Sequence, residues 1–268
     1  MINGKYFAID AHCHIYPEKI ASLAVNHTDG FYDVKSFNKG TIVDLMEVND
    51  KAGIDKSIVQ SVATTPKQVR SINKFIHDSV ETYKDKFIGL GTIHPRSEDI
   101  KGDIENLIEL GLKGIKIHPD IQDFKVDDYG YVKAYEICQD KGIPVLMHTG
   151  DSRFDNSNPN RLLPILKDFD KLTVIGAHFG GWSIWEDACN HYKDVKNFYV
   201  DTSSSFFYIS LDTVKKIIDT YGIDKIMFAT DYPMWNVNDE IEKLLQLNLS
   251  EEDYKKIFSL NAIKAYNL

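Results

Sequence analysis

The sequence is poor in cysteine and has no long apolar run. Its three cysteines, Cys13, Cys138 and Cys189, are odd in number and widely spaced, so we expect free thiols in a reducing cytoplasm rather than a disulfide framework. No segment approaches the ~20 apolar residues of a membrane span, and no charged stretch followed by an apolar run indicates a secretion signal. The net charge of −9 argues against a nucleic acid or an anionic membrane as a partner.

The sequence also lacks internal repeats, low-complexity tracts and linkers. Its 268 residues are a normal length for one α/β barrel and are enough to bury a large core. We therefore expect a single domain over residues 1–268. Nothing in the sequence decides between a monomer and a homo-oligomer.

Short β-type runs alternate with amphipathic helical patterns along the whole chain. The expected strands are residues 5–9, 56–62, 87–92, 114–118, 143–148, 172–178, 198–201 and 225–231. The expected helices between and after them are residues 42–52, 69–83, 103–110, 131–140, 162–169, 185–192, 212–221 and 239–247. Several of these helices are followed by a glycine and an apolar residue, which is a common helix stop before a strand.

Eight strand–helix units predict a parallel sheet closed into a (β/α)₈ TIM barrel. Two further helices, residues 251–258 and 262–266, are expected to follow the last unit, with Ser250 as the N-cap of the first. The alternative is an open, doubly wound sheet. That fold favours a glycine-rich phosphate loop after the first strand, and here the first strand leads into His12-Cys13-His14 instead.

Residues 15–40 are too many for an ordinary loop between a strand and a helix. Their aromatic side chains, Tyr16, Phe31, Tyr32 and Phe37, suggest a partly ordered lid over a site. An irregular surface insertion is the alternative interpretation.

Histidines and one aspartate stand where the expected strands end. His12 and His14 are two residues apart, so in a strand they point to the same side. Later strands end on chemically similar residues, which are Lys116, His118, His148, His178 and Asp231. Each alone could cap a turn, but the carboxyl ends of barrel strands all meet at one rim. Imidazole and carboxylate groups suit Zn²⁺ and, less selectively, Mn²⁺, Fe²⁺ or Co²⁺.

Five motifs in the chain make a family resemblance. They are Asp10-Ala11-His12-Cys13-His14, Gly114-Ile115-Lys116-Ile117-His118-Pro119, Pro144-Val145-Leu146-Met147-His148-Thr149-Gly150, Ala177-His178-Phe179-Gly180-Gly181 and Ala229-Thr230-Asp231-Tyr232-Pro233. With them the chain resembles the amidohydrolase superfamily of metal-dependent (β/α)₈ enzymes. It is most similar to the amidohydrolase-related branch that includes aminocarboxymuconate semialdehyde decarboxylase.

The resemblance implies a metal site and its ligands. His12, His14, His148 and Asp231 would bind the ion, and His178 would be catalytic or bridge to a second ion. Lys116 lies where binuclear relatives carry a lysine carbamate, so with His178 it would help to hold a second ion. The alternative is that Lys116 pairs with Asp231 or another carboxylate. We expect one tightly bound divalent ion, zinc, rather than two.

Two chemistries fit such a site, with a small molecule as the substrate. The first is metal-assisted hydrolysis of an amide, lactone or related bond, in which Asp231 moves the proton and His178 stabilises the oxyanion. The second is non-oxidative decarboxylation of a small aromatic or enol acid. The sequence analysis favours the hydrolase. A metal-binding barrel without turnover is a third interpretation, which the intact ligand set disfavours.

The expected substrate-binding residues are His118, Arg153 and Trp182. Arginine is scarce, with four residues in the chain, and Arg153 follows the fifth strand, where a guanidinium suits a carboxylate. A surface ion pair is the alternative for this arginine. The aromatic residues near the sixth and seventh strands predict a pocket wall for a flat substrate, a subunit interface or plain core. They are Trp182, Trp185, Phe206, Phe207 and Tyr208.

Overall fold

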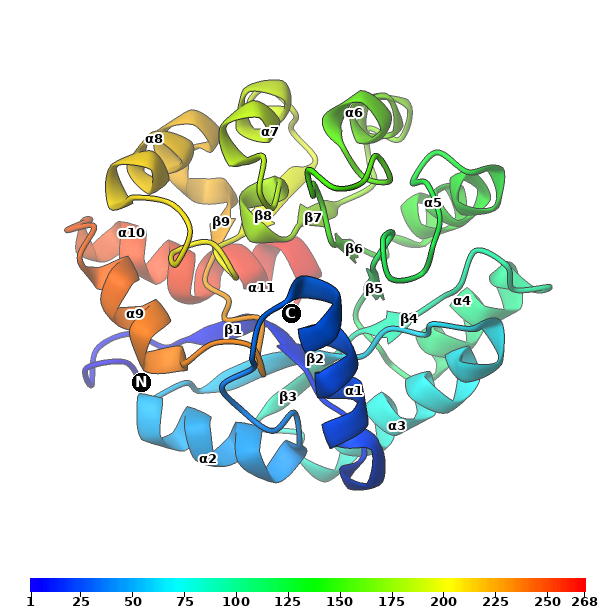
Figure 1. The fold of residues 1–268 in the computed structure, drawn as a ribbon, viewed down its shortest axis with the longest axis horizontal. Helices are drawn as coiled ribbons and strands as arrows, with labels where there is room; N and C mark the ends of the chain where they lie inside the picture. Colours follow the sequence, from blue (N-terminus) through cyan, green and yellow to red (C-terminus); the bar gives the residue numbers. More distant parts are fainter.

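The computed structural model describes all residues from 1 to 268 and is a (β/α)₈ barrel (Figure 1). All strand pairs of the barrel wall are parallel. The strands are β1 (Ile9–His14), β2 (Lys56–Gln60), β3 (Phe87–Gly89), β4 (Gly91–Thr92), β5 (Ile115–Ile117), β6 (Val145–Met147), β7 (Val174–Gly176), β8 (Phe198–Asp201) and β9 (Ile226–Met227). The helices form a ring around these strands.

Nine strand segments make eight barrel positions because β3 and β4 are one strand interrupted at Leu90. The two sheets run in the orders β1-β2-β3 and β4-β5-β6-β7-β8-β9. Main-chain bonds close the barrel between its last and first strands. Ala11 N donates to Phe228 O at 3.0 Å, and His14 N donates to Tyr232 O at 2.7 Å. These bonds hold the segment that carries Asp231 beside the histidines of β1.

The helices follow the predicted order, with ends that differ by a few residues. They are α2 (Ile42–Ala52), α3 (Val69–Thr82), α4 (Ile100–Glu109), α5 (Tyr129–Lys141), α6 (Pro159–Asp168), α7 (Trp185–Tyr192), α8 (Leu211–Tyr221), α9 (Val237–Leu245), α10 (Glu251–Lys255) and α11 (Asn261–Tyr266). The predicted cap is confirmed, because the Ser250 side chain accepts a hydrogen bond from Asp253 N. None of the helices is long and apolar enough to cross a membrane.

The first strand begins later in the structure than the sequence predicts. Residues 5–9 were expected to form it, but β1 begins at Ile9 and includes both His12 and His14. The residues before it form a tight turn in which Ile2 pairs with Tyr6. The register of β1 on β2 shifts between Asp10 and Cys13, which is a bulge-like irregularity within the strand that carries the two histidines.

Strand alternation explains which residues reach the barrel interior. One core, which includes Ile115, Val145 and Val200, packs against the helices. A smaller cluster fills the barrel, and it includes Ile58, Leu146, Ile175, Tyr199, Met227 and Ala229. Because side chains alternate along a strand, a residue that follows a member of this cluster by two positions also points inward, nearer the carboxyl end of the strand. Three such residues are His148, Asp201 and Asp231.

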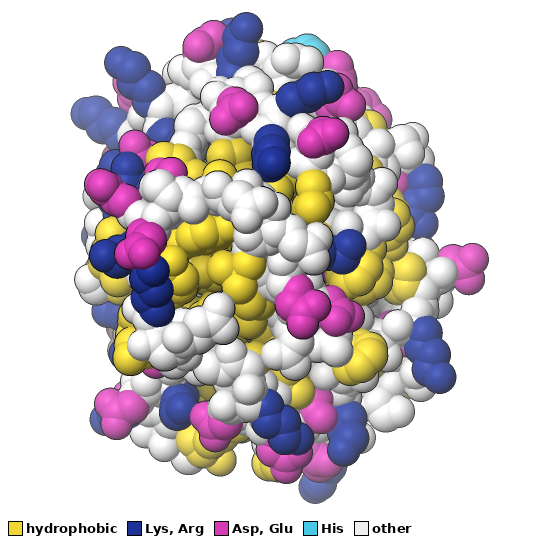
Figure 2. Space-filling model, turned by 90° about the vertical axis from the view of Figure 1, so that its left-hand side faces the viewer, with side chains coloured by type: hydrophobic (Ala, Val, Ile, Leu, Met, Phe, Trp, Pro, Cys, Tyr) yellow, Lys and Arg dark blue, Asp and Glu magenta, His cyan; other side chains and the backbone are white.

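The long segment after β1 contains a helix, α1 (Glu18–Tyr32), of 15 residues. Side chains of α1 line the same cavity as His12, His14 and Asp231. The helix therefore covers part of the barrel mouth, as the lid interpretation predicted. Figure 1 shows it in front of the strands. On the face in Figure 2, charged side chains of both signs surround a hollow in which hydrophobic side chains gather.

Candidate metal centre

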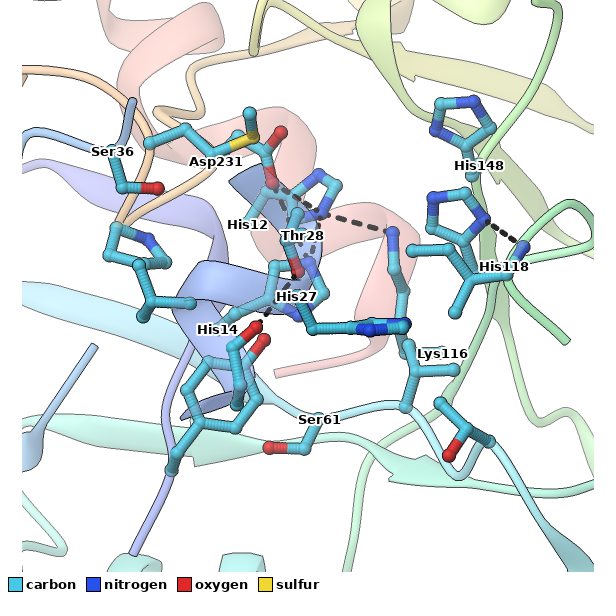
Figure 3. Close-up of a pocket in the computed structure, with 18 of the residues that line it drawn as sticks. His12, His14, His27, Thr28, Ser36, Ser61, Lys116, His118, His148 and Asp231 are labelled. Atoms are coloured by element: carbon cyan, nitrogen blue, oxygen red, sulfur yellow. Dashed lines mark hydrogen bonds and ion pairs between the residues drawn. The ribbon is translucent and has the colours of Figure 1, made fainter. Parts of the chain in front are cut away.

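Three of the predicted ligands converge at the floor of the cavity (Figure 3). His12 Nε2 lies 3.1 Å from His14 Nε2. Asp231 Oδ1 lies 3.3 Å from His12 Nε2 and 3.6 Å from His14 Nε2. A tetrahedral ion with bonds of ~2.0–2.1 Å holds its ligand atoms ~3.3 Å apart. The spacing of the three atoms therefore fits a divalent transition metal.

The charge of Asp231 suits a metal ligand. Burial alone would raise the pKa of this carboxyl group, but His12, His178, His14 and Lys116 hold the pKa well below its ordinary value of 3.8. The carboxylate is therefore ionised at neutral pH. Ser204 Oγ donates to Asp231 Oδ2 at 2.7 Å, and Trp235 Nε1 donates to Ser204 Oγ at 2.7 Å. These bonds leave Oδ1 turned toward the imidazoles.

Asp231 and His178 both have backbone angles that are uncommon for residues with a side chain. Their φ values are 57° and 60°, in the left-handed region. Such strain persists where the surrounding structure fixes it, and it occurs often at functional sites. At these two strand ends it turns the side chains into the barrel mouth.

A second buried carboxylate, Asp201, orients the first ligand. Its Oδ2 lies 2.9 Å from His12 Nδ1, so the ring donates Nδ1–H and its Nε2 lone pair faces the other ligands. Burial opposes ionisation, but His12 and His178 lower the pKa of Asp201 to about 2. The sequence analysis did not name Asp201 as a site residue. The available signal was its place at the carboxyl end of the strand at residues 198–201.

His148 is not part of the three-ligand group. His178 Nδ1 lies 3.1 Å from Ser203 O, which only accepts, so Nδ1 carries the proton and Nε2 accepts. His148 Nδ1 then donates to His178 Nε2 at 3.1 Å. On its other side, His148 Nε2 lies 3.4 Å from Tyr32 Oη. Both ring nitrogens of His148 are engaged in this arrangement, so its role as a metal ligand stays a prediction.

His118 and Tyr32 continue this chain of polar groups. The rings of His118 and His148 stack with centroids 4.1 Å apart, and Tyr32 Oη lies 2.8 Å from His118 Nε2. Burial lowers the pKa of His118 and of His148 well below 6.5, and burial lowers the pKa of His178 to about 4. These imidazoles are neutral at pH 7, as metal ligands and proton acceptors must be.

Lys116 lies beside the three-ligand group, as the sequence predicted. Its Nζ is 3.0 Å from His12 Nε2, and burial lowers its pKa to about 8 although Asp231 and Asp201 oppose this shift. The amine is therefore more easily neutralised than an exposed lysine. A carbamate on Lys116 and a second ion both stay predictions.

The structure separates the three predicted substrate-binding residues. His118 and Trp182 line the cavity, but Arg153 does not. The Arg153 guanidinium pairs with the buried Asp151, and its Nη1 donates to Phe31 O at 2.8 Å. It also lies over the rings of Phe31, Tyr32, Phe154 and Trp182. Arg153 thus attaches the end of α1 to the loop after β6, and we assign it no contact with a substrate.

The aromatic residues also divide between the predicted roles. Trp182 and Tyr208 line the cavity, together with Trp235. Phe206 is buried, and Phe207 stacks on Trp235 with ring centroids 4.5 Å apart. Trp185 donates through Nε1 to Ser205 Oγ at 3.1 Å. The pocket-wall interpretation therefore holds for two of the five residues.

Solved structures with the same fold include enzymes of known activity. A TIM-barrel protein of Bordetella bronchiseptica matches with a TM-score of 0.79 and 20% identity over 96% of this chain and 97% of that one. The 5-carboxyvanillate decarboxylase of Sphingomonas paucimobilis matches with a TM-score of 0.76 and 16% identity, over 98% and 100%. The dihydroxybenzoic acid decarboxylase of Polaromonas sp. JS666, solved with manganese and the inhibitor 2-nitroresorcinol, has a TM-score of 0.74 and 18% identity, over 98% and 97%.

The family is shown by the sequence itself. A model of the amidohydrolase family matches residues 9–268, which is nearly the whole chain and contains every residue of the candidate site. The chain belongs to the amidohydrolase family.

Proposed function

We propose that this protein is a metal-dependent decarboxylase of small aromatic or enolic carboxylic acids. The observation that carries the proposal is the group of His12 Nε2, His14 Nε2 and Asp231 Oδ1 at the floor of an aromatic-walled cavity. Similarly folded proteins that decarboxylate hydroxybenzoic acids support this chemistry over the hydrolysis that the sequence favoured. A metal-binding role without turnover remains the alternative of another class.

We assign the ion to His12, His14 and Asp231, with His148 as a further ligand after rotation of its ring. A divalent ion bound there supplies a Lewis acid that holds an acidic oxygen of the substrate. Zinc and manganese both suit two imidazoles and a carboxylate. Asp201 keeps the His12 proton on Nδ1, so that Nε2 stays available.

The ionised Asp231 is the group best placed to move a proton. It accepts the proton of a hydroxyl group that lies next to the carboxylate on the entering substrate. The carbon–carbon bond to the carboxylate then breaks, its electron pair stays on the ring carbon, and carbon dioxide leaves. Asp231 returns the proton to that carbon, so atoms and charges balance over the cycle.

The other polar groups bind and orient the substrate. No arginine lines the cavity, and Lys116 is its single lysine, so Lys116 is the cationic donor for a substrate carboxylate. Neutral His178, held by Ser203 O at 3.1 Å, keeps its Nε2 turned inward as a hydrogen-bond acceptor. Trp182 and Tyr208 stack on a flat ring.

The test is a substrate panel with metal-loaded protein. Zinc- and manganese-loaded samples are assayed for carbon dioxide release from 2,6-dihydroxybenzoate and 5-carboxyvanillate, and for hydrolysis of aryl amides and lactones. We expect release from at least one hydroxybenzoate and a loss of at least ~100-fold in Asp231→Asn. The surface variant Asp50→Asn is the control. Hydrolysis without carbon dioxide release would overturn the proposal, and silence over the whole panel would favour the binding-only alternative.

A further inference from the structure

The cavity of the candidate site is larger than a single-ring acid requires. Its volume is about 620 Å³, whereas an apolar cavity of ~150 Å³ suffices for benzene. The additional space is lined by two helices, α1 and α3. Neither helix carries a predicted ligand or catalytic group, so this part of the cavity serves something other than the reacting atoms.

Each helix turns one regular face to this space. The α1 residues that line it include Ile20, Leu23, Ala24, His27 and Thr28, and the residues from α3 and the turn before it are Gln68, Ser71, Ile72 and Phe75. Spacings of three and four residues place each set on one side of its helix. We call the apolar part of this space, lined by Ile20, Leu23, Ala24, Ile72 and Phe75, the α1–α3 cleft.

The α1–α3 cleft is apolar and uncovered. Leu23 is 73% exposed and Ile20 is 49% exposed, whereas Ala21 and Val25 of the same helix are buried. Apolar side chains of α1 thus line the cavity without being fully packed in the core. Contiguous exposed apolar surface of this kind usually marks a ligand site.

Charge is confined to the other end of the cavity. Among all residues that line it, the only charged side chains other than histidine are Lys116 and Asp231, and both lie at the floor with the three-ligand group. A ligand that fills the whole cavity therefore has an acidic, oxygen-rich head at the floor and an uncharged apolar arm between the helices. A second acidic group on the arm would find no lysine or arginine among the residues that line the cavity at that end.

We propose that the α1–α3 cleft binds an alkyl arm of the substrate, so that the substrate is a hydroxylated aromatic acid carrying a chain of several carbons. This inference rests on the proposed function for the head of the molecule. The occupant is the arm of the substrate rather than another protein, because the cleft is continuous with the metal-ligand group in one cavity.

The experiment measures binding separately from turnover. Dissociation constants of metal-loaded protein are determined by calorimetry for 2-nitroresorcinol and for its 5-pentyl derivative, neither of which has a carboxylate to lose. A buried methylene tightens binding roughly threefold to fourfold. Partial burial of the chain then predicts that the pentyl derivative binds roughly 10–100-fold more tightly.

Matched variants test whether the alkyl group of the probe lies in the α1–α3 cleft. The double variant Ile20→Gln/Leu23→Gln should reduce the ratio of the two dissociation constants to within roughly threefold of unity. Val43→Gln changes an equally exposed apolar residue on α2, outside the cavity, and should leave the ratio as it is. Equal affinities for the two probes in the wild type, or a ratio that survives the double variant, would overturn the inference.

The two proposals fail in different ways. If the pentyl probe binds tightly through Ile20 and Leu23 but no 4-alkyl-2,6-dihydroxybenzoate releases carbon dioxide, the decarboxylase proposal fails and the cleft assignment stands. If unsubstituted acids are decarboxylated and the pentyl group does not change the dissociation constant, only the cleft assignment fails. Should neither nitroresorcinol bind, the same comparison with benzoate and 4-pentylbenzoate decides the cleft by the same ratio.

Discussion

Asp201 shows how one buried side chain fixes the chemistry of another. Its Oδ1 accepts from His178 N at 3.0 Å, Ser203 N at 3.1 Å and Ser203 Oγ at 2.5 Å. Its Oδ2 is thereby left for His12 Nδ1. Because Oδ1 has three donors and Oδ2 faces His12 Nδ1, the proton of His12 lies on Nδ1 and the lone pair lies on Nε2.

We therefore expect Asp201→Asn to lose metal affinity. The amide oxygen would keep its bonds to His178 N, Ser203 N and Ser203 Oγ, so the amide NH₂ would face His12 Nδ1. Nδ1 would then have to accept a hydrogen bond, and the ring proton would lie on Nε2, where it blocks metal binding. Metal affinity should fall at least ~10–100-fold, as measured by competition with a chelating indicator. The control Asp50→Asn alters an exposed carboxylate that pairs with Lys86. Unchanged affinity in Asp201→Asn would show that His12 is not oriented in this way.

At this scale the sequence predicted residues better than contacts. The two-residue spacing of His12 and His14 and the position of Asp231 at a strand end placed these three side chains together, because strand geometry determines them. It did not reveal that Asp201, 189 residues from His12, faces the His12 ring. Nor did it reveal that His148 turns its Nδ1 to His178, since that depends on a side-chain rotation that many neighbours decide together.

Helix α1 is the element that separates this site from solvent, and few contacts hold it. Its last residues are fixed by Tyr32 Oη, 2.8 Å from His118 Nε2, and by Arg153 Nη1, which donates to Phe31 O at 2.8 Å. The sequence predicted the lid from the length and aromatic content of residues 15–40. The ion pair expected as the alternative for Arg153 is present, with Asp151. The hydrogen bond to Phe31 O was not predicted, because it joins residues 122 positions apart.

We expect Arg153→Ala to loosen α1 without unfolding the barrel. The lost hydrogen bond and ring contacts are partly exposed, so they contribute on the order of 1 kcal/mol. Hydrogen exchange of the α1 amides should accelerate roughly fivefold to tenfold, whereas the amides of β5 to β8 should be unaffected. Arg96→Ala, which removes an exposed pair with Asp123, is the control. Equal α1 exchange in both variants would refute the anchoring role.

Helix α9 buries a carboxyl group that has no partner. Both side-chain oxygens of Glu240 lack a hydrogen bond, and the residue has no exposed surface. Burial, reinforced by Asp10, Asp231 and Asp201, raises the pKa of Glu240 well above its ordinary value of 4.5, although Lys243 opposes this shift. The folded protein therefore binds this proton more strongly than the unfolded chain does.

This difference predicts a pH-dependent effect of Glu240→Gln. Because the folded pKa is raised, the contribution of Glu240 to stability is complete below pH 4.5 and declines as the pH rises toward the folded pKa. The Gln variant lacks this decline. The difference in free energy of unfolding, variant minus wild type, should therefore increase by up to ~1.4 kcal/mol per pH unit above pH 4.5. Urea unfolding at pH 5, 6, 7 and 8 with chelator measures it. The exposed Glu242→Gln on the same helix is the control, and a constant difference across this range would contradict the assignment.

The whole molecule separates its core from its chemistry. The helix-facing core and the barrel interior consist of apolar side chains, and His12, His14 and Asp231 belong to neither cluster. The sequence predicted this architecture from eight alternating strand–helix units and from a first strand that leads into His12-Cys13-His14 rather than into a glycine-rich phosphate loop. It missed helix α1 within the predicted lid. It also missed the start of β1 and the break between β3 and β4, where hydrogen-bond register rather than composition decides the ends.

This separation predicts a folded protein without metal and a more stable one with it. An ion that binds the folded chain alone stabilises it by ~2.7 kcal/mol at a free concentration of 100 times the dissociation constant. For a chain of this size, that corresponds to a rise in melting temperature of roughly 5 °C. Thermal melts followed by far-ultraviolet circular dichroism, with chelator and then with added zinc or manganese, measure both quantities.

His14→Ala provides the matched comparison for these melts. The variant should melt like the metal-free wild type, because its side chain lies at the rim and outside both apolar clusters, and added metal should raise its melting temperature by much less. If the wild type instead lost its helical signal in chelator, the ion would be needed for the fold, and the three-ligand group would hold the barrel together rather than act on a substrate. If metal stabilised His14→Ala as much as the wild type, the ion would bind elsewhere in the molecule.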